Sequence, residues 1–247
     1  ALILTFLVSC NQSQNNKNNQ SKGGDEMDTR VFKIYTNIEM KKVRFKNRYG
    51  IEIAGDLYLP ENYTNQKNPA IVVSGPFGAV KEQASGLYAQ EMATYGFVAL
   101  AFDPSFTGES DGDVRNTSSP DIFTEDYSAA VDYLGLLDYV DRNRIGTIGI
   151  CGLSGMAITA AGTDTRIKAV ATLSMYDMSR DMSRGHQDYY TPEQRRKIRE
   201  YLSEQRWKDA ESKTYALGNH EPYFDENNNL MASAMVVPEK LPENADP

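Results

Sequence analysis

The chain has 247 residues, of which 40% are hydrophobic and 24% charged, and this is enough to bury the core of one α/β domain or of two small ones. Its formal net charge of −8 argues against a nucleic-acid partner, because nucleic-acid-binding surfaces are basic. No apolar run of the sequence approaches the roughly 20 residues that a membrane-spanning helix needs. The two cysteines, Cys10 and Cys151, are too few for a disulfide scaffold.

The start of the chain has the composition of a leader and a tether. Residues 1–10 form an apolar run that ends in Leu7-Val8-Ser9-Cys10. This ending resembles the lipobox of bacterial lipoproteins, in which the cysteine is lipidated. Residues 11–27 are rich in Asn, Gln and Ser, as in a flexible tether. The alternative is a short buried strand with a chance cysteine.

We therefore expect residues 1–10 to be the remnant of a signal peptide and its lipobox. An acyl chain on Cys10 would hold the protein at the bacterial cell envelope, on the periplasmic or outer-membrane side. In this interpretation the lipid anchor is its only contact with the membrane.

Residues 28–180 carry the elements of the predicted core. Alternating polar and apolar residues at its start predict an antiparallel hairpin with one wet face. Continuous apolar strands then alternate with helical stretches, which predicts a mainly parallel sheet covered by helices on both faces. The expected elements are hairpin strands at 42–46 and 51–59, further strands at 70–73, 98–102, 145–150 and 167–173, and helices at 82–95, 127–139 and 152–161.

The segment 144–157 is the most informative part of the sequence, because a predicted strand runs directly into a predicted helix there. Small residues flank Cys151 on both sides of this junction. A nucleophile on such a turn is lifted clear of the sheet, and the amide that follows it can stabilise an oxyanion.

Three stretches together resemble the α/β-hydrolase superfamily, specifically its dienelactone-hydrolase-like branch. They are the loop 75–83, the loop 102–112 with its Gly-Glu-Ser, and the Arg-Ile-Gly…Gly-Ile-Cys-Gly run at 144–152. The resemblance implies a hydrolase that acts on an ester or a similar acyl bond of a small molecule, without a cofactor. It also implies that Gly152 and either Phe77 or Gly78 form the oxyanion hole.

The nucleophile has two candidates. The family pattern is Gly-x-nucleophile-x-Gly, and neither frame of this sequence completes it. Cys151 has Gly149 behind it but Leu153 ahead, whereas Ser154 has Gly152 behind it but Met156 ahead. The length of the strand favours Cys151, while Ser154 remains the second candidate. A small buried thiol without a catalytic role is the structural alternative for Cys151.

The general base is expected outside the core. In the family the acid and then the His follow the nucleophile, and the chain's two histidines are His186 and His220. Both fall in residues 181–247, which we interpret as a helical insertion or lid followed by a truncated C-terminal part. The charged stretch 192–207 is expected to be a solvated amphipathic helix or part of that lid. We expect the catalytic acid and His, together with the last strands of the sheet, to lie beyond Pro247.

The sequence leaves a function of another class open, namely a catalytically silent lipoprotein of the same fold that binds a ligand or partner. Leu153 in the predicted elbow is the feature that favours it. No His, Cys and Asp cluster with metal-ligand spacing is present in the sequence, so we expect no metal.

Overall fold

The computed structural model describes residues 29–218, 224–231 and 236–237. This part of the chain divides into two compact units, of which the first ends at Tyr176 and the second begins at Asp177. The predicted tether and Cys10, the predicted site of lipidation, lie outside the described residues.

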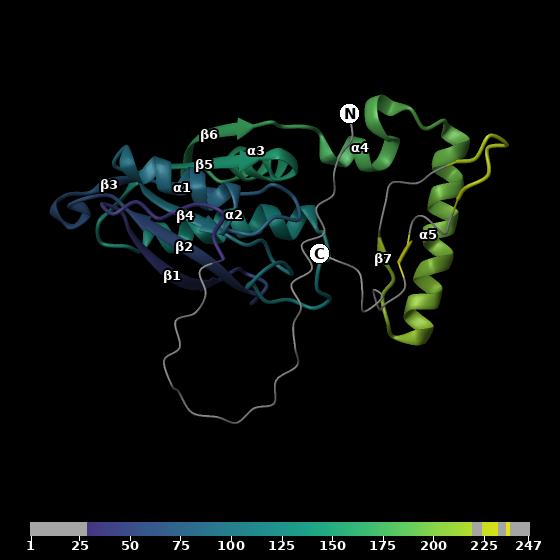
Figure 1. The fold of residues 1–247 in the computed structure, drawn as a ribbon, viewed down its shortest axis with the longest axis horizontal. Helices are drawn as coiled ribbons and strands as arrows, with labels where there is room; N and C mark the ends of the chain where they lie inside the picture. Colours follow the sequence, from purple (N-terminus) through teal and green to yellow (C-terminus); the bar gives the residue numbers. More distant parts are fainter. Residues whose placement is uncertain (1–28, 219–223, 232–235, 238–247) are drawn as a thin grey trace, which may run out of the picture. The chain divides into compact units, whose positions relative to one another are not determined.

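The first unit is built on a six-stranded sheet of order β1-β2-β4-β3-β5-β6 (Figure 1). β1 pairs antiparallel with β2, β2 pairs antiparallel with β4, and the pairings among β4, β3, β5 and β6 are parallel. The strands are β1 (Glu39–Lys46), β2 (Glu52–Leu59), β3 (Asn68–Ser74), β4 (Val98–Phe102), β5 (Val140–Ile150) and β6 (Ile167–Leu173).

The parallel part of the sheet is apolar because each central strand is covered on both faces. All five residues of β4 are buried, and Val72 in β3 pairs with Leu100 on one side and with Thr147 on the other. The strand that leads to Cys151 is β5, which ends at Ile150 and lies between β3 and β6. The predicted α/β-hydrolase-type sheet is therefore confirmed.

The carboxyl ends of β3, β4 and β5 lie at the same edge of the sheet and are tied together. The Ser74 hydroxyl donates to the Phe102 carbonyl at 3.1 Å, joining β3 to β4. The buried Tyr127 hydroxyl donates to the Ser74 carbonyl at 3.3 Å. The loops that follow these strands therefore begin from a rigid edge of the sheet. This is the edge at which open α/β sheets bind ligands.

The hairpin is present, but its predicted wet face is wrong for β2. β1 alternates between exposed and half-buried residues, whereas seven of the eight β2 residues are buried. β4 pairs with the far edge of β2, and the segment before β1 covers it. Arg30 donates to the Asp56 carboxylate at 2.6 Å, and Phe32 packs against the core cluster that includes Tyr58.

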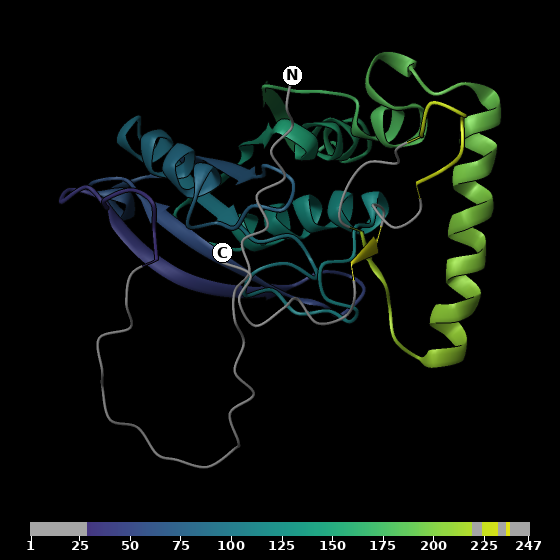
Figure 2. The same ribbon diagram turned by 45° about the vertical axis from the view of Figure 1, so that its right-hand side comes forward.

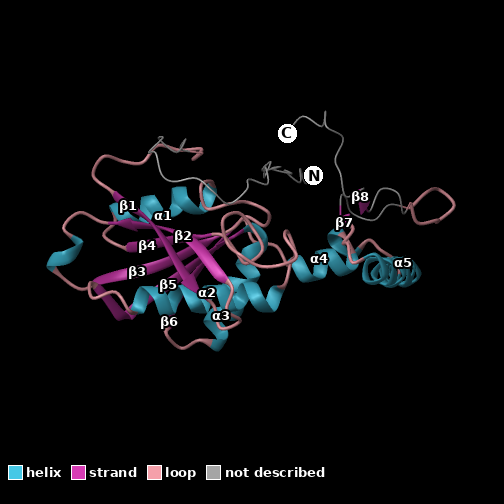
Figure 3. Ribbon diagram, turned by 90° about the horizontal axis from the view of Figure 1, so that it is seen from below, coloured by secondary structure: helices cyan, strands magenta, loops and turns pink. Residues whose placement is uncertain are grey.

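Helices cover the two faces of the sheet (Figure 3). α1 (Ala84–Thr94) packs on β3 and β4, while α2 (Pro120–Gly135) and α3 (Ser154–Thr163) pack on the other side and against each other. The predicted bounds 127–139 were wrong for α2. The helix begins earlier because the Ser119 side chain caps it by accepting from the Ile122 amide, and because proline is favoured in a first turn.

The second unit is mostly helical and contains α4 (Met178–Arg184) and α5 (Pro192–Ser212). α5 is one continuous helix (Figure 2), and none of its residues is buried. Thr191 and Gln194 form a capping box at its start. Two short strands, β7 (Leu217–Gly218) and β8 (Val236–Val237), pair antiparallel. The prediction that this segment acts as a lid stays a prediction.

Candidate active site

The junction between β5 and α3 is a sharp turn centred on Cys151. The 3₁₀ helix η2 (Cys151–Leu153) connects the two elements, and Cys151 has φ 54°. A side chain with a Cβ rarely adopts this left-handed conformation, which costs roughly 1–3 kcal/mol and concentrates at functional sites. The Cys151 thiol is free and half-buried.

Gly149 makes this turn sterically possible. A Cβ at this position would lie 2.6 Å from the Cα of Ser154 and 2.8 Å from the Cβ of Ala157. Both distances are shorter than real contacts, so a side chain here would push α3 away from the end of β5. A glycine two residues before Cys151 is therefore required by the packing of the helix on the strand.

Leu153 is accommodated two residues after Cys151, although the family pattern has glycine there. Its side chain is buried at 1% exposure and lies beside the loop that follows β3. A Cβ on Gly75 would lie 3.0 Å from the Cβ of Leu153 and 2.4 Å from the carbonyl oxygen of Ile150. Gly75 thus leaves the space that Leu153 needs and brings the loop after β3 against the elbow.

Ser154, the other nucleophile candidate, lies in a different environment. It is the first residue of α3, with right-handed helical φ −60° and ψ −39°, and it is fully buried. Its hydroxyl donates to the carbonyl of Gly149 at 2.8 Å. The side chain therefore satisfies a backbone group within the turn.

The predicted oxyanion residues belong to the two backbone segments that approach each other at the elbow. Gly152 is buried within η2. Phe77 and Gly78 form the tip of the loop after β3, where the Ala79 amide donates to the Pro76 carbonyl at 3.1 Å and closes a turn. Gly78 has φ 77°, which glycine adopts without strain.

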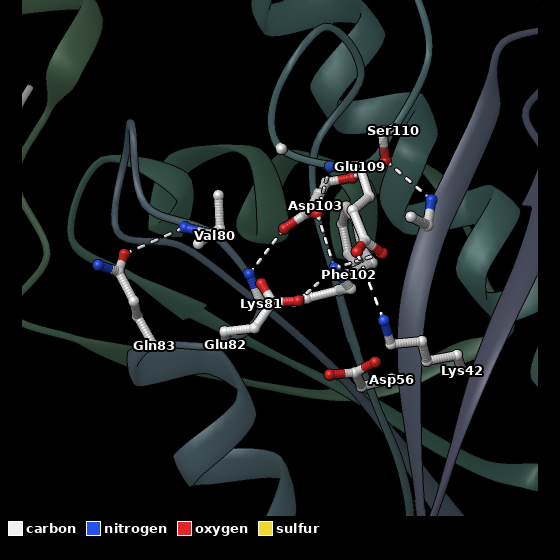
Figure 4. Close-up of polar contacts among 12 residues, drawn as sticks. Lys42, Asp56, Val80, Lys81, Glu82, Gln83, Phe102, Asp103, Glu109 and Ser110 are labelled. Atoms are coloured by element: carbon white, nitrogen blue, oxygen red, sulfur yellow. Dashed lines mark hydrogen bonds and ion pairs between the residues drawn. The ribbon is translucent and has the colours of Figure 1, made fainter. Parts of the chain in front are cut away.

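Four charged residues meet at the base of this loop (Figure 4), of which Lys81, Glu82 and Asp103 are buried and Glu109 is exposed. We call Lys81, Glu82, Asp103 and Glu109 the Lys81 cluster. The Lys81 ammonium is 2.6 Å from Glu82, 3.0 Å from Glu109 and 3.2 Å from Asp103, and its side chain is 1% exposed. All four residues lie in the stretches 75–83 and 102–112 that carry the family resemblance, but the sequence did not predict that their side chains meet.

Burial and charge oppose each other in the Lys81 cluster. Burial raises the pKa of Asp103 to about 6, even though the Lys81 charge and backbone N–H donors act in the other direction. Burial also acts to raise the pKa of Glu109, but the hydrogen bond from Lys81 and the positive charges of Lys81 and Lys42 outweigh it and lower the pKa. For Lys81, nearby negative charge outweighs burial and raises the pKa, so the ammonium stays protonated.

A second buried network holds the loop after β4. The Asp126 carboxylate in α2 accepts from the Ser105 amide at 2.8 Å, from the Ser105 hydroxyl at 2.9 Å and from the Asn47 side chain at 2.8 Å. Burial raises the pKa of Asp126 to about 6 against these hydrogen bonds. This network joins the β1–β2 turn, α2 and the loop.

The other predicted features are placed as follows. His220 lies outside the described residues, and His186 is an exposed residue of the second unit whose Nδ1 is 3.7 Å from the Asp181 carboxylate. Within the described ranges, no three His, Cys, Asp or Glu side chains are grouped to hold a metal ion. In the part of the chain that the structure describes, no helix is both long enough and apolar enough to cross a membrane.

Comparison with known proteins gives a family and a similar solved structure. The model of the X-Pro dipeptidyl-peptidase (S15) family matches residues 49–229. The uncharacterized protein PA2218 of Pseudomonas aeruginosa is 54% identical over 230 residues, a match that covers 90% of this chain and 61% of that protein. Its crystal structure aligns with a TM-score of 0.76 and 56% identity, covering 83% of this chain and 63% of the other.

Two further relatives are more distant. The thiohydrolase aneE of Aspergillus aculeatus is 33% identical over 132 residues, which cover 53% of this chain and 40% of aneE. The structure of DcsB in complex with its substrate analogue aligns with a TM-score of 0.63 and 26% identity, covering 76% of this chain and 59% of the other. The chain spans less than two thirds of the length of each of these relatives.

Proposed function

Because the chain belongs to the X-Pro dipeptidyl-peptidase (S15) family, we propose that it hydrolyses an ester or a similar acyl bond of a small molecule through Cys151. The family match and the fold confirm the predicted α/β-hydrolase superfamily. The observation that carries the proposal is the left-handed backbone of Cys151, at φ 54°, where the central strand β5 ends. That is the conformation with which a nucleophile elbow exposes its side chain.

The proposed reaction runs through an acyl-enzyme. The Cys151 sulfur attacks the carbonyl carbon of the substrate, the thiol proton passes to a general base, and the carbonyl electrons move onto oxygen. The amides of Gly152 and of Phe77 or Gly78 hold this oxyanion, each worth roughly 3–4 kcal/mol. Collapse re-forms the carbonyl and expels the leaving group, which takes up the proton. Water then attacks the thioester, releasing a carboxylic acid and restoring the thiol.

The name of one relative supports acyl chemistry of this kind, because aneE is called a thiohydrolase. Cys151 is preferred to Ser154 because the Ser154 hydroxyl is buried and donates to the Gly149 carbonyl at 2.8 Å. The Cys151 thiol is half-buried and lies at the turn itself.

The test is acylation by p-nitrophenyl acetate, followed by p-nitrophenol release and by mass spectrometry of the modified peptide. In the full-length protein without substitutions, we expect one acetyl group, bound to Cys151. Cys151→Ala should lose this adduct and several orders of magnitude of esterase rate. Cys10→Ala is the matched control, since it replaces the other cysteine and should leave acylation of Cys151 unchanged.

Other outcomes would replace the proposal. An adduct that survives Cys151→Ala and is lost in Ser154→Ala would move the nucleophile to Ser154. Cleavage of an Ala-Pro anilide without any ester hydrolysis would make the protein a peptidase. Absence of any adduct, with no loss of rate in either variant, would favour the catalytically silent binding protein.

We also propose that Cys10 carries a lipid and is the only membrane anchor. The support is the lipobox-like Leu7-Val8-Ser9-Cys10 followed by the polar tract 11–27. Cys10→Ala should abolish labelling by a fatty-acid analogue and should move the protein from the membrane fraction to the soluble one. Cys151→Ala should change neither, and a Cys10→Ala protein that stays lipidated and membrane-bound would overturn the proposal.

A further inference from the structure

We infer that Lys81 is a positioning residue for the oxyanion hole, holding the loop 75–83 at the carboxyl end of β4 through Asp103. The inference rests on the function proposed above, because it assumes that Phe77 or Gly78 donates to an oxyanion. Lys81 itself touches no substrate in this scheme and acts through the backbone of the loop.

Asp103 is a fixed point on the sheet. It follows directly after β4, and its amide donates to the Ala54 carbonyl of β2 at 3.0 Å. The Ser110 hydroxyl donates to the Asp103 carbonyl at 2.7 Å and accepts from the Ala54 amide at 2.8 Å. The Asp103 backbone is thereby tied to two neighbouring segments.

The Asp103 carboxylate joins two loops. One oxygen accepts from the Lys81 amide at 2.6 Å, and the other is 3.2 Å from the Lys81 ammonium and accepts from the Glu109 amide at 2.9 Å. Gly108 makes this approach possible, because a Cβ there would lie 2.4 Å from the carboxylate. Lys81 thus contacts the same group with both its backbone and its side chain.

Charge explains why the cation at this position matters. Three carboxylates, those of Glu82, Asp103 and Glu109, surround one buried ammonium. Without it, the Glu82 and Asp103 carboxylates would be buried next to one another, and they would move apart, take up protons or admit water. Each of these changes would release the Lys81 amide from Asp103 or shift it.

The path from Lys81 to the proposed oxyanion donors is short and stiff. The Pro76–Ala79 turn encloses Phe77 and Gly78, and the Gln83 side chain accepts from the Val80 amide at 3.2 Å. Because only a few residues separate Lys81 from the loop tip, a shift of the Lys81 backbone should also shift Phe77 and Gly78. Misplacement of a reacting group by about 1 Å can cost about 100-fold in rate.

The experiment compares two reactions of Cys151 in Lys81→Met, made in the Cys10→Ala background. Acylation by p-nitrophenyl acetate passes through an oxyanion, whereas alkylation by iodoacetamide is a direct displacement at carbon and forms none. We expect acylation to slow by about 10- to 100-fold and alkylation to stay within about two-fold. The effect should appear in the maximal acylation rate, with little change in the concentration of ester that gives half of it.

One control variant and one replacement variant separate positioning from damage to the fold. Leu134→Ala removes a fully buried side chain of α2. The next residue, Gly135, lies beside Ile145, near the start of the parallel part of β5. The Leu134→Ala variant should lower stability without changing the ratio of acylation to alkylation. If Lys81→Met does not fold, Asp103→Asn takes its place: it can still accept from the Lys81 amide but loses the charge, and it should lower the ratio several-fold.

The outcomes are distinct. Equal loss of both reactions in the variants, or no loss of acylation, would overturn the positioning role of Lys81. A Cys10→Ala protein with Lys81 intact that is alkylated at Cys151 but never acylated would instead overturn the proposed function.

Discussion

Two buried carboxylates, Asp103 and Asp126, hold the loop that follows β4, and the fold stabilises them in different ways. Asp103 faces the Lys81 ammonium at 3.2 Å within a cluster of four charged residues. Asp126 accepts hydrogen bonds from the amide and hydroxyl of Ser105 and from the Asn47 side chain, all between 2.8 and 2.9 Å. Burial raises the pKa of both groups to about 6.

The difference shows that a buried carboxylate can be held by a counter-ion or by neutral donors with different consequences. Neutral donors form short-range bonds, each of which can be lost separately. A shared cation couples several carboxylates, so its loss affects all of them at once. The loop of the proposed oxyanion hole depends on the coupled arrangement.

The largest effect is expected from removing the shared cation. Lys81→Met should lower the free energy of unfolding by about 3–5 kcal/mol, because it leaves buried carboxylates uncompensated. Chemical denaturation at pH 7 measures this loss. Adding Asp103→Asn should recover part of it, and a double variant less stable than Lys81→Met would contradict the coupling.

The next effect is on the pH dependence of stability. Asp103 and Asp126 should contribute to it in the same pH range as long as Lys81 is present. The pKa of Asp126 is raised from 3.8 to about 6, so the folded protein binds a proton more tightly than the unfolded chain between these values. The contribution of Asp126 to stability is therefore greatest at low pH. It falls by up to about 3 kcal/mol as the pH rises from about 4 to about 6, and is flat above.

Subtracting the Asp126→Asn stability curve from that of the unsubstituted protein should isolate this decline. In a Lys81→Met background the decline due to Asp103 should extend to higher pH, because the positive charge of Lys81 lowers the pKa of Asp103 in the folded protein, while the decline due to Asp126 should stay. A shift of both together would show that the networks are not independent.

A smaller effect is expected from a single neutral donor. Asn47→Ala should cost about 1–3 kcal/mol in unfolding free energy, since it removes one donor from the buried Asp126 carboxylate and the acceptor of the Tyr49 and Ile51 amides. Asn47→Asp, which places a like charge against Asp126, should cost more at pH 7 than at pH 5. Equal costs at both pH values would mean that Asp126 is not charged at neutral pH.

The smallest effect tests whether the burial of a charged group, rather than its charge alone, determines how much unfolding free energy is lost when it is removed. Arg166 pairs with Asp132 and Asp164 at the surface, where its side chain is 49% exposed. Arg166→Met should cost no more than about 1 kcal/mol, and less in high salt. A loss as large as that of Lys81→Met would refute the argument from burial.

Much of the fold could be predicted because its signals are local. The apolar runs at 70–73, 98–102 and 145–150 predicted strands that are present, since strands covered on both faces must be apolar throughout. The bounds of α2 were missed because Ser119 and Pro120, which start it, lie in a loop-like stretch. The burial of β2 depends on residues before β1 and could not be seen in its own alternation.

The candidate site divides in the same way. Cys151 could be proposed from its place at the end of a strand, and its nucleophile role stays a prediction. The Lys81 cluster could not be found, because Lys81 meets Asp103 across 22 positions of the sequence and only through the pairing of β3 with β4. Isolated charged residues in loops are usually solvated, so their types alone indicate no burial.

The packing of Gly75 against the elbow determines which residues of this turn can change during evolution. Position 75 is closed to every side chain, because a Cβ there would lie 2.4 Å from the Ile150 carbonyl, a backbone atom that no substitution removes. Position 153 is constrained by side-chain space alone, so smaller apolar residues can replace Leu153 while the backbone turn is kept. Among homologues we expect residue 153 to vary in size and residue 75 to remain glycine, with no compensating exchange between the two positions.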